Sequence, residues 1–250
     1  MRSTRRKMLL PALLAVLALS AVAASSAQAA TAEGPFYKIT GTRLLEGKTK
    51  EVTSKLKTGD TFRIENEIGV KVECRGESAV KGAKLLGSTG ASSSTGEATL
   101  EFTECETAYV TRESSCDQDL GTIKTAALKV ELGYTDSART GDIAVVFVPV
   151  KGRLFGTLTI PTSGSCEATE LPLEGDLAGL IESGHKLVTV GSEPAQSKTL
   201  EIHYPGKSEA FFEAGGKLTD TKTVLSDGPD FLPIGGLALE AGGAEWGVFT

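Results

Sequence analysis

The chain has 250 residues and a formal net charge of −6, from 26 basic and 32 acidic residues. The first 29 residues hold four of the basic residues and none of the acidic ones, so the rest of the chain has a charge of −10. This balance argues against nucleic acid as a partner, because nucleic-acid binders carry a basic face that displaces counterions from phosphates.

The first predicted element is a signal peptide over residues 1–29. Four basic residues between Arg2 and Lys7 precede an apolar run over residues 8–24, and Ala27-Gln28-Ala29 supplies a small-x-small cleavage site. The run is short for a membrane-spanning helix, which needs about 20 apolar residues. We therefore expect a secreted, extracellular or cell-envelope protein with no transmembrane span after processing. The Arg5-Arg6 pair also fits a twin-arginine signal, but the general secretory route is favoured.

Residues 30–250 predict a single all-β domain, an antiparallel sandwich- or barrel-like fold with many short strands. Apolar and polar residues alternate with a period of two in several segments, which is typical of half-buried strands. Residues 143–150 are almost uninterrupted apolar and β-branched residues, which favours burial on both faces. Strands are expected at residues 61–64, 70–74, 98–103, 128–134, 143–150, 155–160, 168–173, 187–190, 200–203, 210–212, 217–220 and 245–249.

Two segments break this pattern. Residues 176–182 place Leu177, Leu180 and Ile181 on one helical face, although Gly179 limits such a helix to about two turns. Residues 87–96 consist mainly of glycine, serine and threonine and offer little apolar surface. The first segment therefore predicts a short helix, and the second a flexible loop.

Four cysteines, Cys74, Cys105, Cys116 and Cys166, lie after the signal peptide. Their even number and the oxidising destination predict two disulfides. A four-thiolate zinc site is the alternative, but such sites group cysteines in close pairs, and these are 31, 11 and 50 residues apart. Of the three possible connectivities we favour Cys105 with Cys116, closing a short loop, and Cys74 with Cys166, joining distant strands.

Motifs for cofactors, metals and nucleophiles are weak. His185 and His203 are the two histidines, and neither has a second histidine at the spacing of a zinc site. Ser163-Gly164-Ser165 lacks the setting of a hydrolase nucleophile, and no phosphate-binding glycine loop occurs. Asp117-Gln118-Asp119 and Asp227-Gly228-Pro229-Asp230 each offer two acids to calcium, but turns explain both. We therefore assign no cofactor, no metal and no catalytic residue.

A carbohydrate site is harder to judge from sequence. A glycosidase needs two carboxylates across a sugar, and the sequence cannot select such a pair among 32 acidic residues. Exposed aromatic residues that would line a sugar cleft are scarce, since most of the one Trp, four Tyr and nine Phe fall within strand patterns. Trp246 and Tyr204 remain, and Trp246 is better explained as a cap on the core.

Four motifs occur in order in the middle of the chain. They are the alternating segment 96–105 that ends at Cys105, then Cys116, then Gly121-Thr122-Ile123-Lys124-Thr125, then Leu132-Gly133-Tyr134. Between about Cys74 and Cys166 this pattern resembles a group of uncharacterised secreted actinobacterial proteins. The group carries glycine before the first of these cysteines, where this chain has Glu104. The resemblance implies export and disulfides, and it brings no activity or catalytic residue.

Three function classes remain open on the sequence. The first expectation is a non-catalytic secreted or cell-surface binding or structural module, with cell-wall polysaccharide or another surface protein as its partner. The alternative is a secreted carbohydrate-active enzyme that uses paired carboxylates. A third possibility is a protein-binding effector or inhibitor that presents the loop 87–96 to its partner.

Overall fold

The computed structural model is all-β, with no helix among the residues it describes. These residues are 34–56, 61–66, 70–76, 79–89, 93–110, 115–136, 138–162, 169–183, 186–189, 196–205, 208–214, 217–223, 225–226 and 230–249. Only the backbone is described for 55–56, 66, 70, 79–81, 108–110, 115–117, 169, 205, 208–214, 217–223, 225–226 and 230–234. All lie in one compact unit, Glu33–Thr250. Within these ranges, no helix has the length and hydrophobicity to cross a membrane.

Strands make up most of the described chain, which confirms the predicted all-β class. They are β1 (Phe36–Ile39), β2 (Thr42–Arg43), β3 (Thr49–Leu56), β4 (Phe62–Asn66), β5 (Val70–Cys74), β6 (Ala79–Leu86), β7 (Thr95–Val110), β8 (Ser115–Lys124), β9 (Leu128–Tyr134), β10 (Ile143–Pro149), β11 (Leu154–Ile160), β12 (Thr169–Glu174), β13 (Leu177–Ser183), β14 (Lys186–Leu187), β15 (Thr199–Pro205), β16 (Ser208–Ala214), β17 (Lys217–Thr223), β18 (Leu225–Ser226), β19 (Asp230–Glu240) and β20 (Trp246–Phe249).

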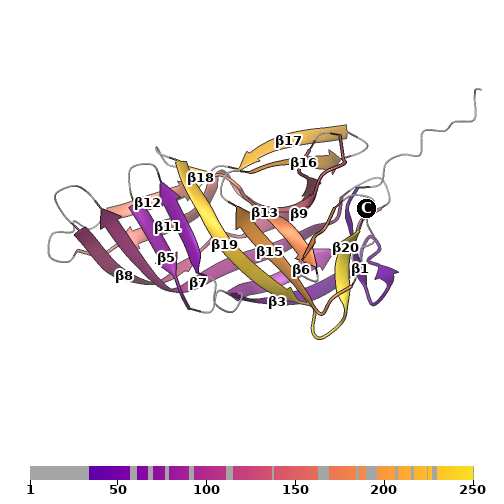
Figure 1. Cartoon of the computed structure of the whole chain (residues 1–250), viewed down its shortest axis with the longest axis horizontal. Helices are drawn as coiled ribbons and strands as arrows, with labels where there is room; N and C mark the ends of the chain where they lie inside the picture. The colour runs from indigo at the N-terminus through magenta and orange to yellow at the C-terminus, as the bar shows by residue number, and fades with distance from the viewer. Residues whose placement is uncertain are drawn as a thin grey trace, which may run out of the picture. The chain divides into compact units, whose positions relative to one another are not determined.

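Eight of these strands close into an antiparallel barrel (Figure 1). Around the ring the order is β3, β6, β7, β9, β10, β13, β15 and β19, and β19 then pairs with β3. Ring neighbours follow one another along the chain apart from excursions, which is the up-and-down order. The fold is therefore a barrel, the second of the two predicted architectures.

The sheet continues beyond the ring through two long strands. The second half of β7 pairs with β5 on one edge and with β8 on the other. The first half of β19 pairs with β4 and with β18 in the same way. β4 and β5 also pair with each other. The chain therefore leaves the ring after β3, forms this second set of strands, and returns to the ring at β6. β11 and β12 form their own two-stranded sheet. A bridge between Gly156 of β11 and Thr125, the residue after β8, connects this sheet to the main one.

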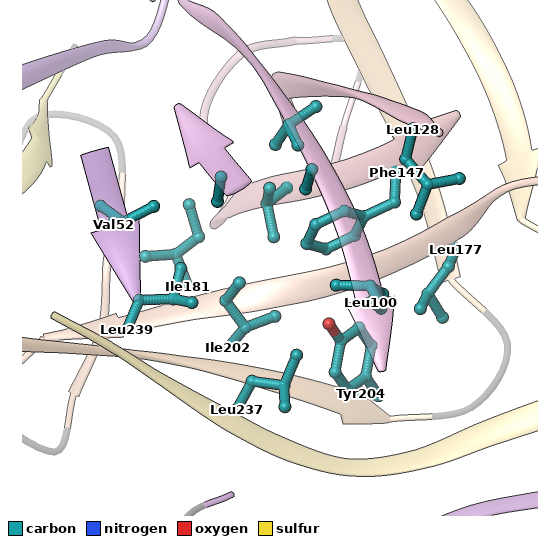
Figure 2. Packing of buried hydrophobic residues seen from close by; sticks show 14 of the residues in the cluster. Val52, Leu100, Leu128, Phe147, Leu177, Ile181, Ile202, Tyr204, Leu237 and Leu239 are labelled. Atoms are coloured by element: carbon teal, nitrogen blue, oxygen red, sulfur yellow. The ribbon is translucent and has the colours of Figure 1, made fainter. Parts of the chain in front are cut away.

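Side chains alternate across the barrel wall and fill its interior. Figure 2 shows inward residues of the ring gathered in one cluster, including Phe147 from β10 and Tyr204 from β15. Phe62 stacks on Phe102 at 4.1 Å between ring centroids and meets Tyr204 edge-on at 5.7 Å. An eight-stranded barrel is just wide enough for side chains to fill, and Phe62, on β4 outside the ring, joins the same core cluster.

β10 is buried on both faces, as its sequence predicts. Val145 and Phe147 point into the barrel cluster, whereas Ala144 and Val146 form a separate buried cluster with Ala178 on the outer face. The β16–β17 hairpin contacts β13 and pairs with β9, and it lies over this side of the barrel (Figure 1). The continuous apolar run of β10 therefore serves two packing layers.

The helix predicted for residues 176–182 is wrong. The segment forms strand β13, in which Leu177, Gly179 and Ile181 face inward between β10 and β15. The spacing of Leu177, Leu180 and Ile181 fits a helix as well as a strand, and pairing on both edges decides for the strand. Tertiary context has overridden a weak local pattern.

The serine-rich segment predicted as a loop is held at both ends. Gly87 and Ser88 form parallel bridges with Glu46 and Leu45, and the Ser88 and Ser94 hydroxyls lie 3.1 Å apart in a buried hydrogen bond. Ser94 N–H donates to the Pro35 carbonyl, and β7 begins at the next residue. Residues 90–92 lie outside the described chain.

Candidate functional site

The disulfide in the structure joins Cys74 to Cys105, so the favoured pairing of Cys74 with Cys166 and of Cys105 with Cys116 is wrong. Cys74 on β5 lies directly opposite Cys105 on β7, with their Cα atoms 3.9 Å apart. The pairing follows from strand register, which the sequence spacing does not reveal. The side chain of Cys116, on β8, and the whole of Cys166 lie outside the described residues.

The other residues considered from the sequence do not form a common site. His203 is exposed on β15, and Asp119 is exposed on β8. Trp246 is fully buried, which confirms it as a core residue, and Tyr204 is fully buried as well, so neither is an exposed sugar-stacking ring. His185, residues 163–165, Asp227 and the side chains of Asp117 and Asp230 lie outside the described part of the chain.

A β-bulge in β7 follows the residue Phe102. Phe102 pairs with Ile123 of β8 and Cys105 pairs with Gly121, so two residues, Thr103 and Glu104, lie opposite the single Thr122. Bulges re-aim side chains and are common beside functional sites. This bulge turns the backbone just before the disulfide-bonded Cys105.

The two residues that follow β5 hold the bulge in place through backbone hydrogen bonds. Arg75 N–H donates to the Glu104 carbonyl at 3.2 Å, and Gly76 N–H donates to the Thr103 carbonyl at 3.1 Å. A Cβ on Gly76 would lie 2.3 Å from Thr103 Oγ1 and 2.9 Å from its carbonyl oxygen, so only glycine permits this approach. Together with the disulfide, these contacts hold the bulge in one position.

An open groove of about 440 Å³ lies over the bulge. It is lined by Thr103, Glu104, Glu106, Asp119, Gly121 and Thr122, with more polar than apolar surface. The residues come from the two paired strands β7 and β8, so a rigid ladder positions them. The sequence motif Asp117-Gln118-Asp119 contributes one member of the set, and Glu104 and Thr122 fall in the segments noted around Cys105 and Gly121, while Glu106 was not singled out from the sequence.

Glu104 occupies a backbone conformation that is costly for it. Its φ is +53°, in the left-handed region, and its side chain is exposed. For an L-residue other than glycine this conformation costs about 1–2 kcal/mol. A strained non-glycine residue at a groove is a reason to ask what its side chain does.

The carboxylates of the groove have different surroundings. Glu106 Oε2 accepts a hydrogen bond from Arg75 Nη1 at 3.2 Å, and Asp119 Oδ1 accepts one from Gly121 N–H at 2.8 Å. Arg75 also binds Glu73, and hydrogen bonding from Lys71 and then from Arg75 holds the pKa of Glu73 below its usual value. No cluster of three or more His, Cys, Asp or Glu side chains suited to a metal ion occurs among the described residues.

Two further carboxyl groups lie near each other outside the groove. Glu131 is on β9, and Asp176 is in the turn between β12 and β13. Asp176 is half-buried, and its burial, followed by the nearby charge of Glu131, raises its pKa, while Arg153 acts in the opposite direction. Glu131 itself forms an ion pair with Lys129. A carboxyl group whose burial raises its pKa is suited to act as a proton donor.

The raised pKa of Asp176 predicts a pH-dependent effect of Asp176→Asn. The folded state disfavours the charged carboxylate, so this variant should be more stable than the wild type at pH 7. The gain should shrink as pH falls through the raised pKa and vanish below the unfolded value of about 4, where both states are protonated. Urea unfolding of both proteins between pH 3 and 8 measures this. Equal stability at every pH would contradict the inferred environment.

Comparison with known protein families, with curated proteins and with solved structures gives no match to this chain. Its function must therefore be argued from its own residues.

Proposed function

We propose that the protein is an exported, non-catalytic binding module that holds a neutral polysaccharide in the groove over the β7 bulge. The observation that carries the proposal is Glu104, a carboxylate placed over this groove in a left-handed conformation that a glycine would adopt without strain. The disulfide and a signal peptide would both suit a protein that works outside the cell.

The chemistry of the groove favours sugar hydroxyl groups as ligands. Carboxylates accept hydrogen bonds from hydroxyls, and such charge-assisted bonds are stronger than neutral ones. Thr122 adds a hydroxyl that can donate and accept. A volume of about 440 Å³ is within the range of small-ligand sites and suits one or two sugar units. The acidic lining and the net negative charge of the chain would repel an anionic polymer, so a neutral polysaccharide is the class we propose.

Replacing Glu104 tests the proposal because stability and binding should move in opposite directions. Glu104→Gly removes the backbone strain and should raise the free energy of unfolding by about 1 kcal/mol, after the larger entropy of the unfolded glycine is deducted. The same change removes a charged acceptor and should weaken polysaccharide binding about tenfold. Urea unfolding and co-sedimentation with insoluble neutral polysaccharides measure the two effects.

Two variants separate charge from backbone. Glu104→Gln keeps the strained conformation and removes the charge, so it should lose binding without gaining stability. Glu170→Gln changes an exposed glutamate on β12, outside the groove, and should leave both properties unchanged. Full binding by Glu104→Gly, or no binding of the wild type to any neutral polysaccharide, would refute the proposed function.

A hydrolase is the second candidate, and the raised pKa of Asp176 beside Glu131 is the observation in its favour. In that function Asp176 would act as the proton donor, the role that one of the two carboxyl groups has in glycosidases. Soluble sugar fragments released by the wild type and not by Asp176→Asn would establish it. Sedimentation without fragments would favour the binding module.

A further inference from the structure

The turn that joins β10 to β11 presents apolar and basic side chains to solvent. It consists of Val150, Lys151, Gly152, Arg153 and Leu154, all of which are exposed, and we call it the basic turn. Val150 is 57% exposed and Leu154 is 42% exposed, so the turn holds two of the four large apolar side chains that lie exposed in the described chain. Single exposed apolar residues are ordinary, whereas two of them on either side of two cations form a surface that calls for an explanation.

Backbone hydrogen bonds hold the basic turn near both of its ends. Val150 N–H donates to the carbonyl of Ala127, which is also exposed, at 2.9 Å. The Arg153 carbonyl accepts a hydrogen bond from Gly175 N–H at 2.8 Å. Gly152 has a φ of 65°, a conformation that glycine adopts without strain, and it lets the chain bend between the two cations. The backbone is therefore already ordered, and a ligand would not have to order it.

The charge of the basic turn contrasts with the charge of the chain. Residues 143–166 contain two charged residues, Lys151 and Arg153, and no acid, although the chain after residue 29 has a net charge of −10. Lys151 forms no ion pair with another described residue. Arg153 Nε lies 4.0 Å from Glu174, and the half-buried Asp176 is the other acid close to it. An exposed ion pair at this distance contributes little, so both cations remain available to a ligand.

An anionic phospholipid surface matches this arrangement of side chains. In a bilayer, a layer of phosphates covers the hydrocarbon, so apolar side chains that reach the acyl boundary leave adjacent cations at the level of the phosphates. The long stems of lysine and arginine suit this depth, because their methylene groups contact apolar surface while the charged ends stay hydrated. An acidic protein would need a pocket shaped for both apolar side chains, whereas a bilayer admits them without one.

We propose that the basic turn docks the protein on an anionic phospholipid surface, with Val150 and Leu154 entering the interface and Lys151 and Arg153 contacting lipid phosphates. Two apolar side chains and two cations give weak, reversible attachment, with an association constant on the order of 10³–10⁴ M⁻¹. The basic turn shares no residue with the groove over the β7 bulge, so this inference is independent of the proposed function.

Co-sedimentation with phospholipid vesicles tests the proposal. The mature protein is mixed with vesicles of phosphatidylglycerol and phosphatidylcholine in equal parts and, separately, with vesicles of phosphatidylcholine alone. We expect about tenfold stronger binding to the anionic vesicles at about 0.05 M salt, and loss of most of this difference at about 0.5 M, because salt screens exposed charges. Absence of wild-type binding to the anionic vesicles would overturn the proposal and leave an acidic protein as the partner to test.

Two double variants show which groups carry the binding. Lys151→Glu combined with Arg153→Glu reverses both charges, and it should weaken binding to the anionic vesicles by more than about tenfold. Val150→Ser combined with Leu154→Ser removes the apolar side chains, and it should weaken binding by about tenfold. All four side chains are exposed, so both variants should fold, which their urea unfolding midpoints verify.

Each double variant has a matched control at exposed residues outside the basic turn. Lys48→Glu combined with Lys186→Glu makes the same change in net charge. Leu45→Ser combined with Leu187→Ser removes the other two exposed large apolar side chains. Both controls should bind the anionic vesicles as the wild type does. If a control loses as much binding as its counterpart in the basic turn, the proposed docking surface is wrong.

Val150→Trp reports whether the turn itself enters the interface. The one tryptophan of the chain, Trp246, is fully buried, so a change in fluorescence on adding vesicles comes from residue 150. The emission should shift to shorter wavelength with the anionic vesicles, because the indole leaves water, and it should not shift with phosphatidylcholine alone. Sedimentation of this variant with the anionic vesicles and no shift in its emission would overturn the proposal, since another surface would then make the contact.

Discussion

Replacing both Cys74 and Cys105 with alanine is expected to lower the free energy of unfolding by about 3–4 kcal/mol. The bond closes a loop of 31 residues, and in the chain-entropy account a loop of this length gives a stabilisation of that size. Cys74 and Cys105 are buried, so the variant also loses a compact apolar contact in the core. Urea unfolding of the double variant against the wild type measures the loss, with the slope of the transition as a check on two-state behaviour.

Peptide mapping under non-reducing conditions is the control for this prediction. Trypsin places each cysteine in a separate peptide, with Cys74 in residues 72–75, Cys105 in 85–112, Cys116 in 113–124 and Cys166 in 154–186. The peptides of Cys74 and Cys105 should be found linked. If all four cysteines are oxidised, Cys116 and Cys166 are left to pair by elimination. Linkage of the Cys105 peptide to the Cys116 peptide would contradict the structural pairing and return to the one that the sequence favoured.

The sequence could predict where many strands lie, because alternation and β-branched runs are local signals. The boundaries expected for residues 70–74 and 128–134 match β5 and β9, and the two-sided burial of 143–150 is found in β10. These predictions succeeded because each segment carries its own burial pattern.

β19 was not predicted, and the reason lies in its composition. The strand contains Pro233 and Gly235, which usually mark turns. In the barrel, β19 pairs with β4 up to Ile234 and with β3 from Leu237 onward, so it changes partner near Gly235. Gly235 has a φ of 139°, and a Cβ there would lie 2.8 Å from the Thr61 carbonyl oxygen. Pro233 and Gly235 therefore give the segment the sequence pattern of a turn, and they lie where β19 changes its partner from β4 to β3.

Closure of the barrel and the make-up of the groove could not be read from the sequence. Both depend on register between segments far apart, such as β19 with β3, which no local pattern encodes. The clearest local sign of the groove was Glu104, a glutamate directly before Cys105. The role of Glu104 could be inferred only from its positive φ, because a charged residue before a cysteine has no structural significance in the sequence alone.

Gly179→Ala is expected to destabilise the protein by about 1–3 kcal/mol, although alanine ordinarily stabilises a strand relative to glycine. Gly179 faces inward on β13, and a Cβ there would lie 2.3 Å from Ile202 Cγ2 and 3.0 Å from Tyr204 Cε1. Both neighbours are fully buried and packed in the core, so neither can turn out into solvent to relieve the contact. Urea unfolding of Gly179→Ala against the wild type measures the cost.

A double-mutant cycle with Ile202→Ala separates this clash from any general intolerance of the strand. Ile202→Ala alone should cost about 2–5 kcal/mol, because it leaves a cavity in the barrel. It also removes the methyl group that the new Cβ would meet. The double variant should therefore be more stable than the sum of the two single losses predicts, by about 1 kcal/mol or more. If the losses in unfolding free energy of the two single variants are strictly additive, Gly179 is required for another reason. The inferred clash between its new Cβ and Ile202 would then be wrong.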